Sequence, residues 1–280
     1  MKKTLSYLKS YKKECILAPL FKLLEACFEL FVPLVIADII DIGISGGNKG
    51  YVWGRVGILA LLAVCGLAFA ITAQYFAAKA AVGFASKLRH ALFTRIQSLS
   101  YADTDKLGTS TLITRMTADV EQVQQGVNMV LRLLLRSPFV VFGAAIMAFT
   151  VDAKSAVTFA VTIPVMSAAV MTIMLITIPL YKKVQAKLDS LLGITRENLS
   201  GVRVIRAFGR QQAEVQAFDK AGASLAAATV RVGVISAALN PVTSVIVNLA
   251  IVAIVWMGAG LANTGGLEQG QIIALVNYMT

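Results

Sequence analysis

The sequence carries little charge for its length. Only 15% of its 280 residues are Asp, Glu, Lys or Arg, whereas 57% are hydrophobic. Soluble domains usually carry about 25% charged residues. A water-soluble domain would have to hide most of this apolar sequence, and the composition therefore favours an integral membrane protein over a soluble globular one.

Residues that bind metals are also scarce. His90 is the only histidine, and none of the three cysteines stands in a CxxC or Cys/His spacing. Cys15, Cys27 and Cys65 all fall in apolar stretches, where a free cysteine packs as a small hydrophobic residue. We therefore expect no metal site and no catalytic residue in this chain.

Long runs without charge divide the chain. Residues 56–78, 155–181 and 232–267 contain no Asp, Glu, Lys or Arg, and a helix needs roughly 20 apolar residues to cross the hydrocarbon core. Two further stretches are less clean, because the first holds three charges and residues 137–151 are few. A sixth begins near Gln271 and is cut off at Thr280. The sequence predicts an all-α polytopic membrane protein whose six spans lie near residues 15–42, 54–78, 137–151, 155–181, 232–262 and 271–280, the last truncated.

Basic residues follow a regular distribution between these spans. The N-terminal tail carries five of the 26 Lys and Arg residues, residues 79–136 carry eight and residues 182–231 carry nine. Cytoplasmic loops accumulate Lys and Arg, so we expect a multi-pass plasma-membrane protein with a cytoplasmic N-terminus and two long cytoplasmic loops. The net charge of +11 is then a topology signal. Nucleic-acid binding is disfavoured, because neither loop is rich in aromatic residues for base stacking.

Both cytoplasmic loops have helical periodicity. Apolar residues continue the helix of the second span as far as Leu99, and a heptad-like stripe returns after the turn at residues 101–108. The second loop has a similar stripe. We expect the spans to leave the membrane as continuous helices that reach about 35–40 Å into the cytoplasm. The returning stripe consists of Ile113, Met116, Val120, Val123, Val127, Val130 and Leu134.

The turning point of the second loop is a short element between glycines. Gly201 and Gly209 flank it, which is typical of a helix that breaks, runs briefly crosswise and breaks again. Its apolar side chains are unfavourable in water at a loop tip, so they either dock on a partner or fold back on the neighbouring helix. The pattern leaves both interpretations open.

Residues 195–210 (TRENLSGVRVIRAFGR) resemble the second intracellular loop in the membrane domain of type I, exporter-type ABC transporters. Residues 101–107, Gly108 and residues 112–120 are similar to the first intracellular loop of that family. The resemblance covers essentially the whole chain, including the order of spans, the short outside connections and the long inside ones.

The resemblance implies that the two turns are coupling helices that lie in clefts of nucleotide-binding domains. In this family, ATP binding brings two such domains together, and the membrane bundle alternates between inward- and outward-facing states to export an amphipathic solute such as a drug, lipid or peptide. ATP and Mg²⁺ are then cofactors of those domains, and a second transmembrane subunit completes a homodimer or heterodimer. The implied coupling residues are Asp103, Thr104, Asp105, Lys106 and Leu107 in the first loop and Gly201, Val202, Arg203, Val204, Ile205, Arg206, Ala207 and Phe208 in the second.

The phosphate-binding motif G-x-x-x-x-G-K-[ST] is missing. The nearest string, at residues 43–50, lacks the Gly-Lys-Ser/Thr ending and is interpreted as a flexible turn. In the family that the chain resembles, the sixth span leads into the ATPase domain. We therefore expect residues 1–280 to be the transmembrane part of a longer ATP-hydrolysing translocase, without its nucleotide-binding domain and without ATPase activity of its own.

Charged residues interrupt the first span. Lys22, Glu25 and Glu29 lie on one helix face, and a lone charge at the bilayer centre costs about 2.5–3.5 kcal/mol on insertion scales. One hypothesis is that Glu25 or Glu29 lines the substrate path and favours cationic cargo. The other is that Lys22 neutralises a glutamate in a structural pair.

Two other functional classes compete with an exporter. An ion-coupled secondary transporter would have internal repeats and broken spans, and would need no long cytoplasmic helices. A non-enzymatic scaffold or channel could use the same fold. A phosphate-binding motif shortly after Thr280 would favour the exporter.

Overall fold

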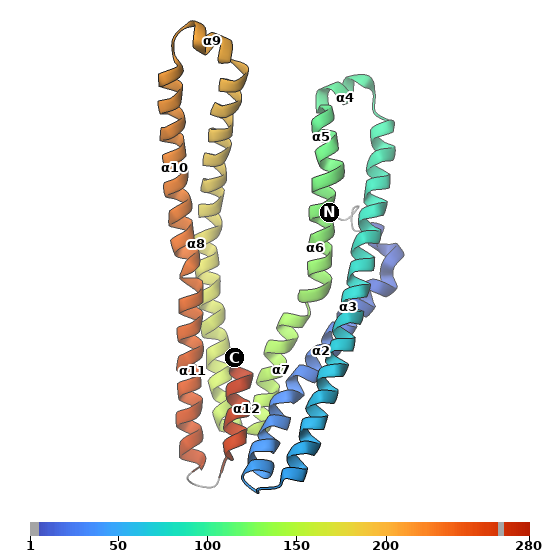
Figure 1. The fold of residues 1–280 in the computed structure, drawn as a ribbon, viewed down its shortest axis with the longest axis vertical. Helices are drawn as coiled ribbons and strands as arrows, with labels where there is room; N and C mark the ends of the chain where they lie inside the picture. Colours follow the sequence, from blue (N-terminus) through green and yellow to red (C-terminus); the bar gives the residue numbers. More distant parts are fainter. Residues whose placement is uncertain (1–5, 263–265) are drawn as a thin grey trace. The chain divides into compact units, whose positions relative to one another are not determined.

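The computed structural model describes residues 6–262 and 266–280, and the described part is helical throughout (Figure 1). The chain divides into two compact units: Met1–Ala156 with Val255–Thr280, and Val157–Ile254. The expected all-α fold is confirmed. In chain order the elements are a 3₁₀ helix η1 (Ser6–Tyr11), α2 (Lys12–Asp38), a π-helix η2 (Ile39–Ile44), α3 (Lys49–Gln97), α4 (Tyr101–Leu107), α5 (Thr109–Thr114), a π-helix η3 (Arg115–Asp119), α6 (Val120–Leu133), α7 (Arg136–Val151), α8 (Ala153–Ser200), α9 (Val202–Ala207), α10 (Gln211–Ala237), α11 (Leu239–Ala262) and α12 (Gln269–Met279).

Two helices are long enough to cross a membrane and continue far beyond it. α3 has 49 residues and α8 has 48, so each is about 70–75 Å long at 1.5 Å per residue. Neither is broken, although Pro164 and Pro179 lie inside α8. α3 and α8 are thus continuous helices, whereas residues 134–135 separate α6 from α7 and residue 238 separates α10 from α11. The position of the bilayer along these helices stays a prediction.

Within the described residues, four helical stretches are long and apolar enough to cross a membrane: Lys49–Gln97, Thr109–Val151, Ala153–Ser200 and Gln211–Ala262. α2 is not among them, because Lys22, Glu25 and Glu29 interrupt its apolar stretch. α12 has only 11 residues. The first and sixth spans therefore stay predictions.

The first unit is built on close packing of α2 against α3. Alanines bury the contact at Ala26 on α2 and at Ala77 and Ala80 on α3, and small residues of this kind allow membrane helices to approach closely. Phe28 and Phe69 stack across the same contact with ring centroids 5.4 Å apart. This packing fixes the face of α2 that carries Glu25 and Glu29.

Large apolar side chains cover much of the outer surface of both units. Leu61 and Ile71 on α3, Leu175 on α8 and Leu249 on α11 are all more than half exposed. A water-soluble protein rarely exposes so much contiguous apolar surface. Helices with outward-facing apolar residues fit a lipid environment.

Candidate coupling helices and charged residues of the first span

α4 forms the tip of the first hairpin. This hairpin consists of the part of α3 beyond residue 78, followed by α4, α5, η3 and α6. The N-terminus of α4 is closed by Ser100, whose hydroxyl accepts a hydrogen bond from the Asp103 backbone N–H at 3.2 Å and donates one to Asp103 Oδ2 at 2.7 Å. Such N-caps stabilise a helix start by about 1 kcal/mol. The helix ends at Gly108, whose φ of 77° belongs to the region that favours glycine. The sequence thus defines both ends of this seven-residue helix.

Every residue of α4 is accessible. The Tyr101 side chain is 94% exposed, Asp103, Asp105 and Lys106 are exposed, and Leu107 is partly exposed. A helix of this length has no intrinsic stability in water and buries nothing within its unit. Its accessible surface carries two acidic residues, Asp103 and Asp105, followed by the basic Lys106.

α9 caps the second hairpin, which is α8 beyond residue 181 together with α9 and α10. It begins after Gly201 and ends before Gly209, which has a φ of 66°. The predicted short helix between these glycines is confirmed, and its six residues lie crosswise between α8 and α10 (Figure 1).

The apolar side chains at this tip do not all fold back on the neighbouring helices. Val204 is 60% exposed and Phe208 is 77% exposed, whereas Ile205 is half-buried. A groove of about 420 Å³ opens beside α9, between the end of α8 and the start of α10, and Leu199, Val202 and Phe218 contribute its apolar lining. Val204 and Phe208 therefore do not fold back on the neighbouring helices.

A polar contact links the two long helices of each hairpin. In the first hairpin, Arg89 on α3 forms a 3.2 Å ion pair with Glu121 on α6. In the second, Lys187 on α8 donates a hydrogen bond to the Ser224 hydroxyl on α10.

The two glutamates of the first span are each paired with a cation. Lys22 Nζ lies 2.6 Å from Glu25 Oε2, and Glu25 is only 8% exposed. Arg136, at the start of α7, lies 2.6 Å from Glu29 Oε2 and donates to both oxygens of that carboxylate. Each pairing offsets part of the cost of a charge in an apolar setting.

A groove of about 460 Å³ between α2 and α3 exposes both carboxylates to one space. Glu25, Glu29 and Phe28 line one side of it, and residues of α3 from Leu59 to Ala70 line the other. Glu29 is much more open than Glu25, since 49% of its side chain is accessible against 11%.

Arg136 is the residue of this site that the sequence interpretation missed. It is 107 positions away from Glu29 and had been counted only as one of the basic residues of the first loop. A contact of that sequence separation has no local pattern. The only available signal was that Glu29 needed a cation and that Arg136 starts an apolar helix.

Among the described residues, no group of three His, Cys, Asp or Glu side chains is placed to hold a metal ion. The residues of α4 and α9 form exposed tips rather than an enclosed site. The geometry of both tips fits contact with another protein domain.

Comparisons with known proteins give the family. Residues 15–280 match the model of the ABC transporter transmembrane region. The chain is 34% identical over 280 residues to the uncharacterized ABC transporter ATP-binding protein YfiB of Bacillus subtilis, covering 100% of this chain and 49% of YfiB. It is 31% identical over 274 residues to the uncharacterized ABC transporter ATP-binding protein MT1311 of Mycobacterium tuberculosis, covering 97% and 47%.

A more distant relative has a named activity. The chain is 23% identical over 280 residues to the ATP-dependent lipid A-core flippase 1 of Colwellia psychrerythraea, covering 100% of this chain and 46% of the flippase. The chain thus spans about half the length of the curated relatives it matches. With two accessible tip helices, apolar spanning helices and a family match over nearly its whole length, this chain belongs to the ABC transporter transmembrane region family.

Proposed function

We propose that the chain is the membrane-spanning domain of an ATP-driven exporter that moves an amphipathic solute by alternating access. α4 and α9 are its coupling helices, and each docks in a cleft of a nucleotide-binding domain. A second transmembrane subunit, either another copy or a related chain, completes the translocation path in the lipid bilayer.

The accessible apolar tip of α9 carries this proposal. Val204 and Phe208 are more than half exposed at the end of a hairpin whose long helices share the hydrogen bond from Lys187 to Ser224. Exposed apolar side chains far from a predicted membrane are unfavourable unless a partner covers them. A partner that binds this tip can tilt the hairpin, and the membrane helices that continue from it would tilt as well.

ATP and Mg²⁺ belong to the partner domain in this proposal. The 280 residues contain no G-x-x-x-x-G-K-[ST] motif, and the relatives named as ATP-binding proteins are about twice as long as the chain. ATP hydrolysis is thus an activity of the full-length translocase, and the role of this chain is to convert domain closure into helix movement.

An amphipathic solute fits the groove between α2 and α3. Its lining combines aromatic and aliphatic side chains with the partly accessible carboxylate of Glu29. A lipid, drug or peptide with an apolar body and a positive group would find both partners there. The name of the flippase relative supports a lipid-like solute without specifying one.

Disulfide or bifunctional cross-linking from α9 tests the coupling. In the full gene product, with Cys15, Cys27 and Cys65 replaced by serine, V204C is expected to cross-link to the nucleotide-binding domain, with a yield that changes when a non-hydrolysable ATP analogue is added. V230C, an equally exposed valine along α10 but away from the tip, is the matched control and should not cross-link. Equal yields for both variants, or none for V204C with and without nucleotide, would refute the docking.

Transport assays separate the exporter from an ion-coupled transporter. In proteoliposomes whose transporters have their ATP-binding side outward, solute uptake should require ATP and should be inhibited by vanadate. The uptake should persist when a protonophore and ionophores collapse the ion gradients. Transport that survives without ATP and fails without a gradient would support the secondary transporter. The absence of any ATP- or gradient-dependent transport would favour the scaffold.

A further inference from the structure

A separate pocket lies between α8 and α10, inside the second unit and away from the tip at α9. It has a volume of about 260 Å³ and is lined by Lys183, Lys187 and Leu180 from α8 and by Ser224, Arg231 and Val232, with two alanines, from α10. None of these residues belongs to the proposed coupling helices or to the groove beside Glu29. The pocket therefore needs its own explanation.

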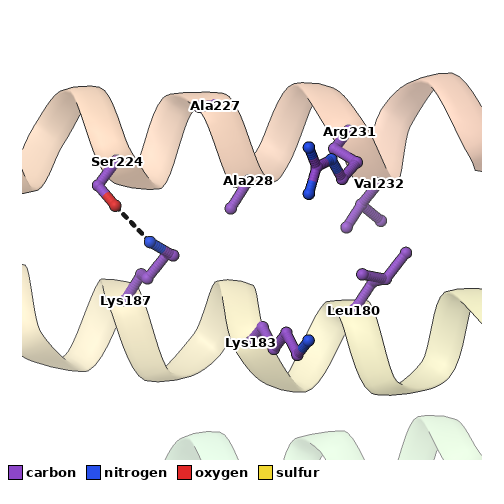
Figure 2. Close-up of a pocket in the computed structure, with 8 residues that line it drawn as sticks. All are labelled: Leu180, Lys183, Lys187, Ser224, Ala227, Ala228, Arg231 and Val232. Carbon is purple, nitrogen blue, oxygen red and sulfur yellow. Dashed lines mark hydrogen bonds between the residues drawn. The ribbon is translucent and has the colours of Figure 1, made fainter.

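The pocket gathers three cations without a carboxylate. Lys183 and Lys187 are four residues apart on α8 and so share a face, and Arg231 extends from α10 toward the same space (Figure 2). Across residues 6–262 and 266–280, no ion pair involves Lys183, Lys187 or Arg231. Like charges gathered in this way repel one another, and a bound anion would relieve that repulsion.

The lining of the pocket combines polar and apolar side chains. Lys187 and its hydrogen-bond partner Ser224 mark one end, Leu180 and Val232 mark the other, and Arg231 lies beside Val232 (Figure 2). Val232 is almost fully buried, whereas Lys183 and Arg231 are exposed. A ligand that fills the pocket therefore has an anionic group joined to an apolar part.

The predicted membrane boundary passes through this pocket. The fourth span is predicted to end at Tyr181 and the fifth to begin at Val232. At 1.5 Å per residue, Lys183 and Lys187 lie about 3 Å and 9 Å beyond the end of the fourth span. The headgroup layer on each side of the hydrocarbon core is about 5–8 Å thick, so Lys183 and Arg231 lie at headgroup depth and Lys187 lies at the outer edge of that layer. Leu180 and Val232 fall within the predicted spans.

We infer that this pocket binds the phosphate headgroup of an anionic phospholipid from the cytoplasmic leaflet, with Lys183, Lys187 and Arg231 as its ligands. Basic pockets between membrane helices on the cytoplasmic side suit anionic headgroups. The lipid links α8 and α10 at the point where they leave the membrane. At this point, movement of the second hairpin is passed to the membrane-spanning parts of the same helices.

Binding of defined lipids to the full gene product tests this site. Native mass spectrometry in detergent, with phosphatidylglycerol or phosphatidylcholine of equal acyl length added, gives the apparent affinity of each bound lipid. The wild-type protein is expected to bind phosphatidylglycerol at least tenfold more tightly than phosphatidylcholine. K183Q/K187Q should lose that preference by about tenfold.

Two comparisons control for charge and for folding. K182Q/K220Q also removes two positive charges, one from α8 and one from α10. Lys182 lies at the same depth as Lys183 but does not line the pocket. This variant should bind phosphatidylglycerol as the wild type does. K183R/K187R keeps the charge and should keep the preference, which separates lost binding from a misfolded hairpin.

Three results would overturn the inference. The first is a lipid preference unchanged in K183Q/K187Q. The second is an equal loss in K182Q/K220Q, which would indicate a general surface attraction. The third is displacement of phosphatidylglycerol by equimolar inorganic phosphate, which would identify a free-anion site rather than a lipid site.

Discussion

The backbone N–H of Gly270 donates a 2.6 Å hydrogen bond to Oδ1 of Asp41, joining the first turn of α12 to η2 at the end of the first span helix. The two residues are 229 positions apart. A carboxylate at a helix N-terminus satisfies an unpaired N–H and interacts favourably with the helix dipole. A second bond, from the Tyr278 hydroxyl to the Leu30 carbonyl at 2.6 Å, joins the other end of α12 to α2. The first and last predicted spans are thus fixed to each other at both ends.

Gly270 allows this close approach. A Cβ at this position would lie 2.4 Å from the Ala37 carbonyl oxygen and 2.6 Å from Asp41 Oδ2. We predict that G270A lowers the free energy of unfolding by about 1–3 kcal/mol, the usual cost of overpacking, because backbone atoms cannot move aside. Thermal unfolding of the purified full gene product in detergent measures the effect. G260A is the control, since its Cβ would meet nothing within 4 Å and alanine is favoured in a helix. Equal midpoints for the two variants would contradict the contact.

Substitutions of the two glutamates of the first span should affect different properties, one stability and the other export. E25Q leaves Lys22 without its carboxylate at a buried position, and removal of one partner from a buried pair costs about 3–5 kcal/mol. E29Q removes a partly accessible charge from the α2–α3 groove. We therefore predict that E25Q mainly lowers the unfolding midpoint, whereas E29Q mainly lowers export of a cationic dye, by several-fold, and spares an uncharged substrate.

Dye export from proteoliposomes and thermal unfolding, measured on the same samples, check both expectations. E121Q is the matched control, because it breaks a similar Arg–Glu pair between α3 and α6 outside the predicted spans. If E25Q/E29Q exports cationic dyes at the wild-type rate, neither glutamate selects the cargo and both pairs are structural.

Gly108 sets the direction in which the chain leaves α4. Its φ of 77° and ψ of 133° form a backbone conformation that residues with a Cβ rarely adopt. G108A should cost about 1–3 kcal/mol at this position, which α4 relieves by changing its orientation. We predict a several-fold fall in solute transported per ATP hydrolysed, with the helical content unchanged. G126A, in the middle of α6 with open space around its Cβ, should transport normally, and a normal transport ratio in G108A would refute a precise role for this turn.

Local patterns in the sequence predicted more of this structure than long-range ones. The tips were predictable because glycines mark helix breaks in the sequence, and Gly108 and Gly209 adopt the positive φ that favours glycine. The long helices were predictable because unbroken apolar runs and helical spacing continue through them. The partner of Glu29 and the Gly270–Asp41 contact were not, since each joins residues more than a hundred positions apart.

The π-helix η3 explains why the predicted stripe of the first hairpin is only partly buried. A π turn takes more residues than the 3.6 of an α turn, so it rotates the faces that follow against those before it. Val120 is buried, and Met116 and Val127 are half-buried. The stripe residues exposed in this chain are Ile113, Val123, Val130 and Leu134. Leu112, which the stripe did not include, is buried instead.

The ion pair between Glu14 and Lys79 should make the N-terminal end of α2 sensitive to acid. Lys79 Nζ lies 3.1 Å from Glu14 Oε1 and joins the first turn of α2 to α3, just outside the predicted spans. A backbone hydrogen bond at Glu14 and the hydrogen bond from Lys79 hold the pKa of Glu14 below its usual 4.5. The same hydrogen bond raises the pKa of Lys79 above 10.5.

The direction of the pH effect follows from these two shifts. A lowered carboxyl pKa stabilises the fold above about pH 4.5, and the contribution is lost as the pH falls through the pKa of folded Glu14. A raised lysine pKa stabilises below about pH 10.5 and is lost above it. We therefore predict no change between pH 5 and pH 10, and a loosening of the start of α2 below about pH 4.5.

A nitroxide attached at K9C, read by electron paramagnetic resonance, should become more mobile in that acid range. In E14Q/K79Q the nitroxide should already be more mobile at neutral pH and show no further acid step. High salt should reduce the step in the wild type, because the pair is accessible to solvent. An acid step of equal size in E14Q/K79Q would assign it to another carboxylate.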